Sequence, residues 1–320
     1  MRCASADRRR NGTLPVIKPR AVRPGDRIAV VSPASPFARD ELERGVGELR
    51  RLGYEPVYEE SIFDTALFTS GPPEARAAAF MRAWSDPEVA ALIAVRGGYG
   101  SVQLLPVFDS WTPQRLPKLF IGYSDNTSLL SWLTCQCGVT ALHGPMLERR
   151  LARGEEGYDS HSFLTLMQGG GQGLQLSPDG LSAVRSGEAA GPLFGGTITQ
   201  LVGSLGTPFA FDPPDGSILF LEDVNERPYR IHRMLTQLRQ SGILARARAL
   251  VFGQMRGCGP EQSPAIHDVI HSFAVDFAGP VLTGFPSGHT TGPCWTLPLG
   301  VRVRVVTSPA SLIVEESPVS

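Results

Sequence analysis

Cysteine is scarce in this sequence, long apolar runs are missing and the net charge is close to zero. The five cysteines are scattered and include no CxxC pair, so we expect neither a disulfide framework nor a zinc site, and this usage is typical of a reducing cytoplasm. No run of about eighteen apolar residues is present, so we expect no transmembrane span. A net charge of −1 argues against nucleic acid or an anionic membrane surface as the main partner.

The first 20 residues lack the apolar stretch that would follow the arginines of a secretory signal, and we interpret residues 1–20 as a disordered extension. The rest of the 320-residue chain, which is 42% hydrophobic overall, is long enough for two domains with sizeable cores. A segment rich in glycines and charged residues, with little hydrophobic periodicity, separates the two expected domains. We therefore expect an N-terminal α/β domain over 21–155, a linker over 156–190 and a C-terminal β-rich domain over 191–320.

Short apolar segments alternate with segments of helical spacing along the first half of the chain. The run 90–95 is apolar throughout and lies between an Asp-Pro pair and glycines, which is typical of a buried parallel strand. Such alternation predicts an α/β fold with a doubly wound parallel sheet, whose ligand crevice lies at the carboxyl ends of the strands. We expect strands at 27–31, 57–58, 90–95, 119–122 and 140–142, and helices at 39–52 and 70–84.

The second half carries further strand patterns and a hairpin. Valines alternate with arginines from 301 to 305, and a turn at Pro309 precedes the apolar run 312–314, which predicts a half-buried antiparallel hairpin. The other expected strands are 218–221, 249–252 and 281–284, with helices at 228–238 and 264–274.

The segment KLFIGYSDN at 118–126 is followed directly by leucines at helical spacing, which predicts a strand, a sharp turn and a helix. In such a turn the Ser124 hydroxyl stands clear of the sheet edge. The N–H of Asp125 points into the same space, where it can bind a developing oxyanion. Ser124 is therefore a candidate nucleophile. The alternative is that Ser124, Asp125 and Asn126 only cap the helix, a role that suits all three residue types.

The loop RGGYGS at 96–101 follows the expected strand 90–95 and is rich in glycine. Glycines let the backbone approach a ligand closely and turn N–H groups outward, although this loop lacks the spacing of a dinucleotide fingerprint. Three interpretations stay open: a phosphate site, a tight turn, or a glycine N–H that completes an oxyanion hole beside Ser124. Arg96 is either the partner of a substrate carboxylate or an ordinary loop charge.

An acid and a histidine follow two strands of the second half. Glu222 is the first polar residue after the strand 218–221, where a carboxylate tends to be partly buried and to need a partner; helix capping is the alternative. His289 follows a strand and a glycine, a position that suits a general base on a loop. His143 ends the strand 140–142 and is a candidate to line the cleft. The other histidines fall in helical patterns and are expected to be surface or packing residues.

The three residues occur in the order serine, acid, histidine, as in the α/β-hydrolases, although a triad is defined by its geometry. The motifs around them resemble those of the L,D-carboxypeptidase family of serine peptidases, which includes the murein tetrapeptide carboxypeptidases and the microcin C immunity peptidase. The likeness extends from about residue 23 to residue 305. It rests on IGYSD at 121–125, RGGYG at 96–100, LEDVNERPYR at 221–230 with MLTQL at 234–238, and GFPSGH at 284–289 with TLPLG at 296–300.

This resemblance implies a flavodoxin-like N-terminal domain beside a smaller β-rich C-terminal domain, with the active site between them. It implies a catalytic triad of Ser124, His289 and Glu222, and an oxyanion hole formed by the N–H groups of Asp125 and Gly98. It also implies a homodimer with no metal and no cofactor. The implied substrate is a small peptide, the murein tetrapeptide, cleaved between a dibasic residue with an L-centre, meso-diaminopimelate or lysine, and terminal D-Ala.

Two other functions stay open. Within the family, the chain could hydrolyse a peptidyl or aminoacyl nucleotide, as the microcin C immunity peptidase does, although the segment 234–238 favours the murein enzymes. Outside the family, the chain could be a non-catalytic two-domain protein that binds a phosphate or sugar phosphate at the glycine-rich loop. The candidate substrate-binding residues are Arg96, Gly97, Tyr99, His143, Arg227 and Arg230.

Overall fold

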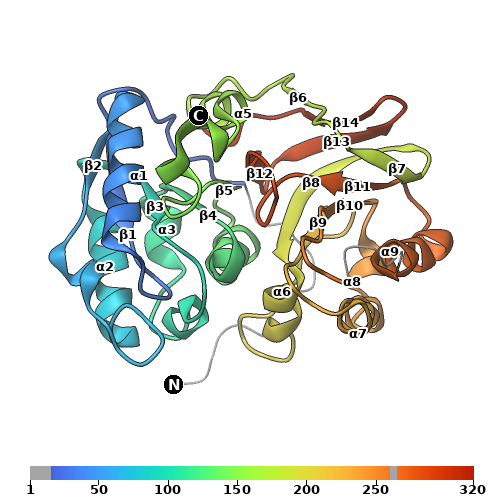
Figure 1. Ribbon diagram of the computed structural model, residues 1–320, viewed down its shortest axis with the longest axis horizontal. Coiled ribbons are helices and arrows are strands. Elements are labelled where there is room, and N and C mark those ends of the chain that lie inside the picture. Colours follow the sequence, from blue (N-terminus) through green and yellow to red (C-terminus); the bar gives the residue numbers. More distant parts are fainter. Residues whose placement is uncertain (1–15, 260–264) are drawn as a thin grey trace.

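The computed structural model describes residues 16–259 and 265–320 and contains two β-sheets side by side, each with its own helices (Figure 1). The first sheet has six strands. Five of them run parallel, and β12, which comes from the C-terminal half, pairs antiparallel with β5 at one edge. In order across the sheet, the strands are β12 (Leu297–Leu299), β5 (Ala141–His143), β4 (Leu119–Gly122), β3 (Val89–Ala94), β1 (Arg27–Val31) and β2 (Glu55–Val57).

Helices connect the parallel strands, which confirms the predicted doubly wound sheet. The chain moves from β1 to β2 on one side and then returns to β3 on the other, so the carboxyl ends of β1 and β3 flank the point where the strand order reverses. That is where ligands bind in open α/β sheets. The connecting helices are α1 (Arg39–Arg51), α2 (Pro73–Ser85), α3 (Trp111–Arg115) and α4 (Thr127–Ser131), which continues as the π-helix η4 (Trp132–Cys137); short 3-10 helices are η1 (Glu60–Phe63), η2 (Ser101–Leu104), η3 (Ser124–Asn126) and η5 (Leu151–Glu156).

Local sequence accounts for these elements. All six residues of β3 are buried, as its unbroken apolar run predicts for a strand covered on both faces. Helix α1 has Asp40 and Glu41 in its first turn and Arg50 and Arg51 in its last turn, which complements the helix dipole. Helix α2 begins with a proline, whose missing N–H costs nothing at that position.

The second sheet has eight strands built around β8, which is ten residues long. The first half of β8 pairs antiparallel with β13, and its second half pairs parallel with β9. The strands β8 to β11 are parallel, and the outer strands are antiparallel. In order they are β6 (Gln175–Leu176), β14 (Ala310–Val314), β13 (Arg302–Thr307), β8 (Glu188–Thr197), β9 (Ile218–Glu222), β10 (Ala249–Gly253), β11 (Val281–Phe285) and β7 (Ser182–Arg185).

The structure differs from the expected organisation in three places. Residues 1–20 are not a disordered extension throughout, because Ile17 pairs with Val139 and the carbonyl of Pro19 accepts the N–H of Ser320; residues 1–15 lie outside the described residues. Residues 156–190 are not a plain linker, because they form α5 (Ser160–Met167) and the two edge strands β6 and β7 of the second sheet. Strand β12 belongs to the first sheet although it lies in the C-terminal half. The expected hairpin is present as β13 and β14. The second half also carries the helices α6 (Ile198–Ser204), α7 (Pro228–Gln240), α8 (Ile243–Arg246) and α9 (Ala265–Asp276), at the lower right in Figure 1.

Two hydrophobic clusters form the core. The larger one contains the first sheet and also residues of the second sheet, among them Leu193, Phe220 and Val303. The smaller one contains inward-facing residues of α6, α7 and α9, such as Leu201, Leu235 and Ile270. Because the larger cluster crosses from one sheet to the other, the two halves of the chain pack directly against each other. Among the described residues, no helix is long and apolar enough to cross a membrane.

Candidate active site

Ser124 lies in a sharp turn between β4 and the helix that follows. Its φ of +63° is unusual for a residue with a side chain, and such a conformation costs about 1–3 kcal/mol, so it persists only where the surroundings enforce it. The 3-10 helix η3 begins at Ser124 and leads into α4. Gly122 makes this turn possible, because a Cβ there would lie 3.1 Å from the Cβ of Asn126. The predicted strand, sharp turn and helix are therefore present.

The glycine-rich loop lies directly against the serine. A Cβ on Gly97 would be 2.8 Å from the Cβ of Ser124, 3.0 Å from its Oγ and 3.3 Å from the backbone nitrogen of Asp125. Gly98 has a φ of +102°, and a Cβ there would collide with the side chain of Ser35. The Nδ2 of Asn126 donates a hydrogen bond of 3.1 Å to the carbonyl of Arg96, which holds the loop. The ends of the neighbouring strands β3 and β4 thus place glycine backbone, without side chains, beside the hydroxyl of Ser124.

Asp125 joins the turn at Ser124 to the glycine-rich loop. Its carboxylate accepts a hydrogen bond of 2.8 Å from the backbone N–H of Ser101, and the Ser101 hydroxyl donates one of 2.6 Å to the carbonyl of Asp125. The side chain is almost completely buried, and burial raises the pKa of its carboxyl group. The side chain of Asp125 therefore has a structural role, which leaves its backbone N–H as the group that can act on a substrate.

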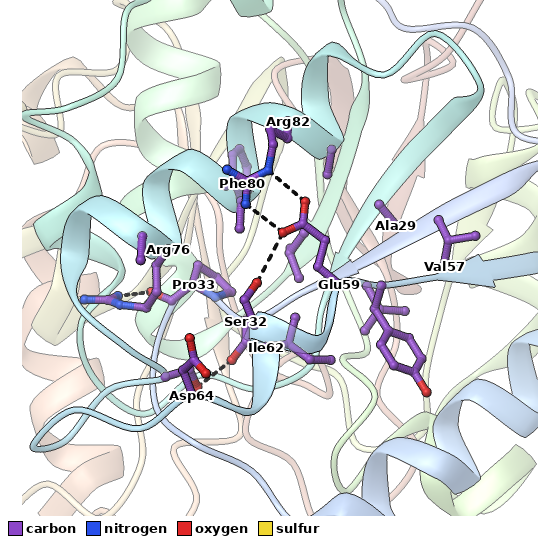
Figure 2. Close-up of a pocket in the computed structure, with 18 of the residues that line it drawn as sticks. Ala29, Ser32, Pro33, Val57, Glu59, Ile62, Asp64, Arg76, Phe80 and Arg82 are labelled. Carbon is purple, nitrogen blue, oxygen red and sulfur yellow. Dashed lines mark hydrogen bonds and ion pairs between the residues drawn. The ribbon is translucent and has the colours of Figure 1, made fainter.

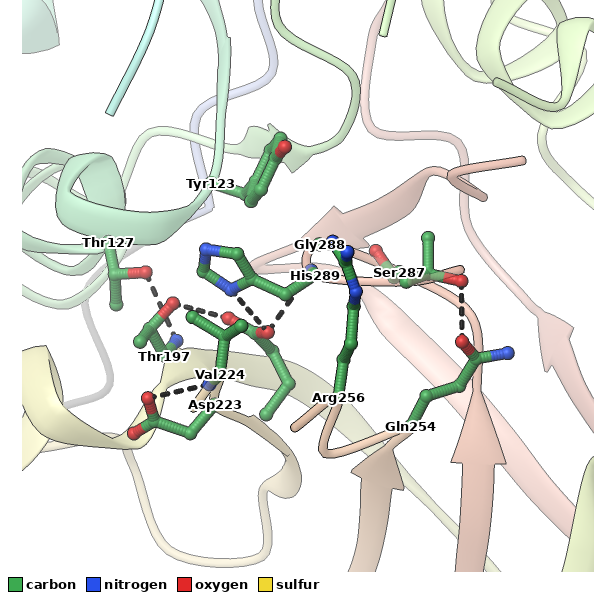
Figure 3. A network of polar contacts seen from close by, with 12 residues as sticks. Tyr123, Thr127, Thr197, Asp223, Val224, Gln254, Arg256, Ser287, Gly288 and His289 are labelled. Carbon is green, nitrogen blue, oxygen red and sulfur yellow. Dashed lines mark hydrogen bonds and ion pairs between the residues drawn. The ribbon is translucent and has the colours of Figure 1, made fainter. Parts of the chain in front are cut away.

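Glu222 and His289 are in direct contact. The Nδ1 of His289, whose ring is labelled in Figure 3, lies 2.8 Å from a carboxylate oxygen of Glu222, and the backbone N–H of His289 donates to the same oxygen at 3.2 Å. The other carboxylate oxygen accepts the hydroxyl of Thr197. Since a carboxylate only accepts hydrogen bonds, Nδ1 carries a proton and Nε2 is left with its lone pair. The imidazole is thereby held in the tautomer that a general base needs.

The Glu222 carboxyl is 1% exposed, so its charge state depends on its partners. Burial alone would raise its pKa, but the charge and hydrogen bond of His289, together with His143 and Thr197, outweigh burial and lower the pKa to about 2. Glu222 is therefore an anion throughout the pH range of interest. A buried anion of this kind stabilises an imidazolium, which is the state of His289 after it takes a proton.

The ring of His289 packs edge-on against Tyr123, the residue before Ser124, with 5.3 Å between the ring centroids. Thr197 provides a second link between the two halves of the chain. Its backbone N–H donates a hydrogen bond of 3.1 Å to the hydroxyl of Thr127 at the start of α4 (Figure 3). A Cβ on Gly196 would lie 2.7 Å from the side chain of Thr127. The sequence analysis did not identify Thr127 or Thr197. The only signal of this contact in the sequence is the Gly-Gly pair before Thr197, because glycines permit close backbone approach.

His143 lies behind the acid and not on a cleft wall. It has no exposed surface, its Nδ1 is 2.8 Å from the Ser287 hydroxyl, and its Nε2 has no partner among the described residues. A Cβ on Gly288 would touch both His143 and the Glu222 carboxyl, at 2.9 and 3.0 Å. Burial lowers the pKa of His143 to about 4, so its ring is neutral. The expectation that His143 lines the cleft does not match this buried position.

Two of the three candidate cationic residues, Arg96 and Arg230, already have partners. The Nε of Arg96 is 3.2 Å from a Glu148 oxygen, and its Nη1 donates 2.8 Å to the carbonyl of Pro36. Arg230 pairs with Glu226 at 2.5 Å on the exposed face of α7. Arg227 is exposed. Arg96 and Tyr99 do share an open pocket with three other residues, which are Ser35, Pro36 and Phe68. This pocket lies at the point where the strand order reverses, next to Gly97.

A separate cavity of about 250 Å³ lies between β1, β2 and α2 at the outer edge of the first sheet (Figure 2). Its lining includes none of the residues discussed above as site residues. Two pairs of its polar side chains bind each other, Glu59 with Arg82 at 2.6 Å and Ser32 with Ser70 at 2.7 Å. Across the described ranges, no group of three or more His, Cys, Asp or Glu side chains could hold a metal ion.

Comparisons with known proteins identify the family. Residues 28–144 match the model of the LD-carboxypeptidase N-terminal domain, and residues 190–305 match that of the C-terminal domain. A probable murein peptide carboxypeptidase of Bacillus subtilis is 31% identical over 304 residues, which is 93% of this chain and 94% of that protein. The microcin C7 self-immunity protein MccF of Escherichia coli is 27% identical, over 88% of this chain and 90% of that protein.

A solved structure has the same fold. The crystal structure of muramoyltetrapeptide carboxypeptidase from Oxalobacter formigenes superimposes with a TM-score of 0.79 at 30% identity, covering 89% of this chain and 97% of that one. Because both domain models match and relatives align over nearly the whole length, the chain belongs to the LD-carboxypeptidase family of hydrolases.

Proposed function

We propose that the protein is a serine L,D-carboxypeptidase that removes terminal D-Ala from murein tetrapeptide. The observation that carries this proposal is the buried Glu222 carboxylate bound to Nδ1 of His289, whose ring packs against the residue preceding Ser124. The family and the murein carboxypeptidases among its relatives support the substrate. The bond cleaved is the amide between a dibasic residue with an L-centre, meso-diaminopimelate or lysine, and the terminal D-Ala.

In the proposed mechanism, the Oγ of Ser124 attacks the amide carbonyl while Nε2 of His289 takes its proton. Glu222 stabilises the imidazolium that forms. The N–H groups of Asp125 and Gly98 bind the negative oxygen of the tetrahedral intermediate. His289 then gives its proton to the amide nitrogen, D-Ala leaves, and an acyl-enzyme remains. Water, deprotonated by the same histidine, attacks the ester and releases the tripeptide and free Ser124.

Recognition of the terminal carboxylate is assigned to the pocket beside Gly97. Arg96 and Tyr99 both line it, and one guanidinium nitrogen of Arg96 remains for a ligand while Nε and Nη1 bind Glu148 and Pro36. Arg230, in its ion pair with Glu226, is the weaker candidate. We further propose that the enzyme acts in the cytoplasm as a homodimer, as the resemblance implies.

A second candidate function is hydrolysis of a peptidyl or aminoacyl nucleotide. The 27% identity to the microcin C7 self-immunity protein over 88% of this chain supports it, and the same serine chemistry suits either acyl group. The two functions differ in the acyl group and in the group that leaves, so a substrate assay separates them.

The test is product analysis by mass spectrometry after incubation with L-Ala-γ-D-Glu-meso-diaminopimelyl-D-Ala, with Ser124→Ala as the matched control. We expect the parent protein to release D-Ala and Ser124→Ala to fold normally without turnover. An aminoacyl sulfamoyl adenylate is assayed in parallel, and cleavage of that compound alone would favour the second function. Hydrolysis of the tetrapeptide by pure Ser124→Ala would refute Ser124 as the nucleophile.

A further inference from the structure

Arg150 is a buried arginine whose hydrogen bonds go to the loop that carries His289. It lies in the segment after β5, at the start of η5, and is 5% exposed. Its Nη2 donates to the carbonyls of Gly288, at 2.8 Å, and Thr290, at 3.1 Å. Its Nη1 donates to the carbonyl of Gly292 at 3.0 Å. One guanidinium therefore holds the backbone on both sides of the histidine.

The same guanidinium also contacts the residue next to the nucleophile. The Nε of Arg150 is 3.4 Å from the hydroxyl of Tyr123, and its Cζ is 5.9 Å from the centre of the Tyr123 ring. Tyr123 precedes Ser124, and its ring touches that of His289. Arg150 thus bridges the strand end that carries the serine and the loop that carries the histidine, which come from different halves of the chain.

The chemistry of this contact suits arginine alone. A guanidinium offers five N–H donors in one rigid plane, whereas a lysine offers three on a single atom. Among the described residues, Arg150 forms no ion pair with a carboxylate, so its buried charge is met by loop carbonyls and the Tyr123 side chain. Burying a cation in this way is costly unless it is fully hydrogen-bonded. An apolar side chain in this position would avoid that cost but could not bind the carbonyls. The hydrogen bonds that Arg150 donates are therefore the reason for an arginine here.

We propose that Arg150 is a positioning residue that sets the distance between the His289 imidazole and the Ser124 hydroxyl. The proposal rests on the proposed serine mechanism. Without the guanidinium, three carbonyls of the 288–292 loop lose their donor, and the loop can shift relative to Tyr123, which also alters the geometry of the bond between His289 and Glu222. A displacement of about 1 Å at a reacting group costs about a hundredfold in rate.

The experiment compares Arg150→Ala, Arg150→Lys and Lys118→Ala with the parent protein. For Arg150→Ala we expect kcat for D-Ala release to fall about a hundredfold, with KM changed less than about threefold. Guanidinium ion added at millimolar concentration should restore part of kcat, because it can enter the vacated space. Arg150→Lys should recover less than the added guanidinium does. Lys118 is the matched control, because it is also buried and binds two carbonyls, but at the amino end of β3.

We expect Lys118→Ala to lower the melting temperature and to keep kcat at a temperature where it is folded. If Arg150→Ala does not fold, Arg150→Lys carries the same comparison. Wild-type kcat in folded Arg150→Ala or Arg150→Lys would overturn the proposal. So would a loss of kcat that guanidinium does not relieve.

A second measurement needs no substrate and separates this proposal from the proposed function. In histidine-labelled protein, NMR detects the Nδ1 proton of His289 that is bound to Glu222. We expect Arg150→Ala to change the shift or exchange rate of this proton, and guanidinium to reverse the change. An unchanged signal would contradict a positioning role even if the parent protein cleaved no murein peptide. Absence of D-Ala release by the parent protein would refute the function alone.

Discussion

Replacing Gly97 with alanine tests whether the glycine-rich loop is part of the catalytic centre. The added Cβ would lie 2.8 Å from the Cβ of Ser124 and 3.0 Å from its Oγ, both well inside van der Waals contact. Gly97 does not have a positive φ, so alanine adopts its backbone conformation without strain. The change therefore acts on the serine and not on the fold of the loop.

The size of the effect follows from these distances. To reach ordinary contact distance, the loop and Ser124 must move apart by several tenths of an ångström or more, and Asp125, whose nitrogen would be 3.3 Å from the new Cβ, must move with it. The hydroxyl and one donor of the proposed oxyanion hole are then displaced together. Loss of one such donor costs about 10²–10³ in kcat, so we expect a fall of at least about a hundredfold, or about 2.7 kcal/mol.

The assay is D-Ala release together with the rate at which a fluorophosphonate labels Ser124. Gly47→Ala is the matched control, because Gly47 lies exposed in α1 and a Cβ there meets nothing within 4 Å. That change should leave kcat alone and raise stability by up to about 1 kcal/mol. If Gly97→Ala retained the parent kcat and labelling rate, the loop would not belong to the catalytic centre and the proposed oxyanion hole would be wrong.

Two further predictions concern Glu222 and His143. Glu222→Gln should keep the fold but lower kcat by about 10³–10⁴, because the amide no longer fixes the histidine tautomer or stabilises the imidazolium; steady-state kinetics check this, and a loss below tenfold would contradict it. His143 should make the protein less stable in acid. Its pKa is lowered from 6.5 to about 4, so the unfolded chain binds a proton before the folded one does, and about 3 kcal/mol is lost as the pH falls through that range. Urea unfolding at several pH values measures this, and His143→Asn should show a weaker pH dependence; equal dependence in both proteins would exclude His143 as the cause.

Much of the fold could be predicted because its signals are local. The strand at 119–122 matches β4, and the start of α1 at Arg39 and of α7 at Pro228 match the expected helices, since apolar period and proline position are properties of a few adjacent residues. The turn at Ser124 could be predicted for the same reason. Strand β12 was not predicted, because the pairing of Leu297–Leu299 with β5 depends on residues more than 150 positions away.

Some residues of the candidate site could likewise be predicted from the sequence and others could not. Ser124, Glu222 and His289 stand at strand ends, which the alternation of strands and helices reveals, and the contact of Glu222 with His289 agrees with that expectation. Arg150 could not be found, because it acts on a segment far away in sequence and belongs to no recognisable pattern, and the only signal for Thr197 is the Gly-Gly pair before it. His143 was misplaced for a related reason. A histidine at a strand end looks the same in sequence whether later segments cover it or leave it open.

The position of β12 bears on how this protein can be divided or rearranged. The loop with His289 leaves β11 in the second sheet and enters β12 in the first, so both of its ends are anchored, one in each sheet. A fragment that stops at residue 155 would leave β5 as a bare edge strand, open to pairing with another chain. The two halves are therefore not exchangeable modules. Shuffling one half between relatives would have to carry residues 297–299 with the N-terminal half, or the recombinant would be prone to aggregation.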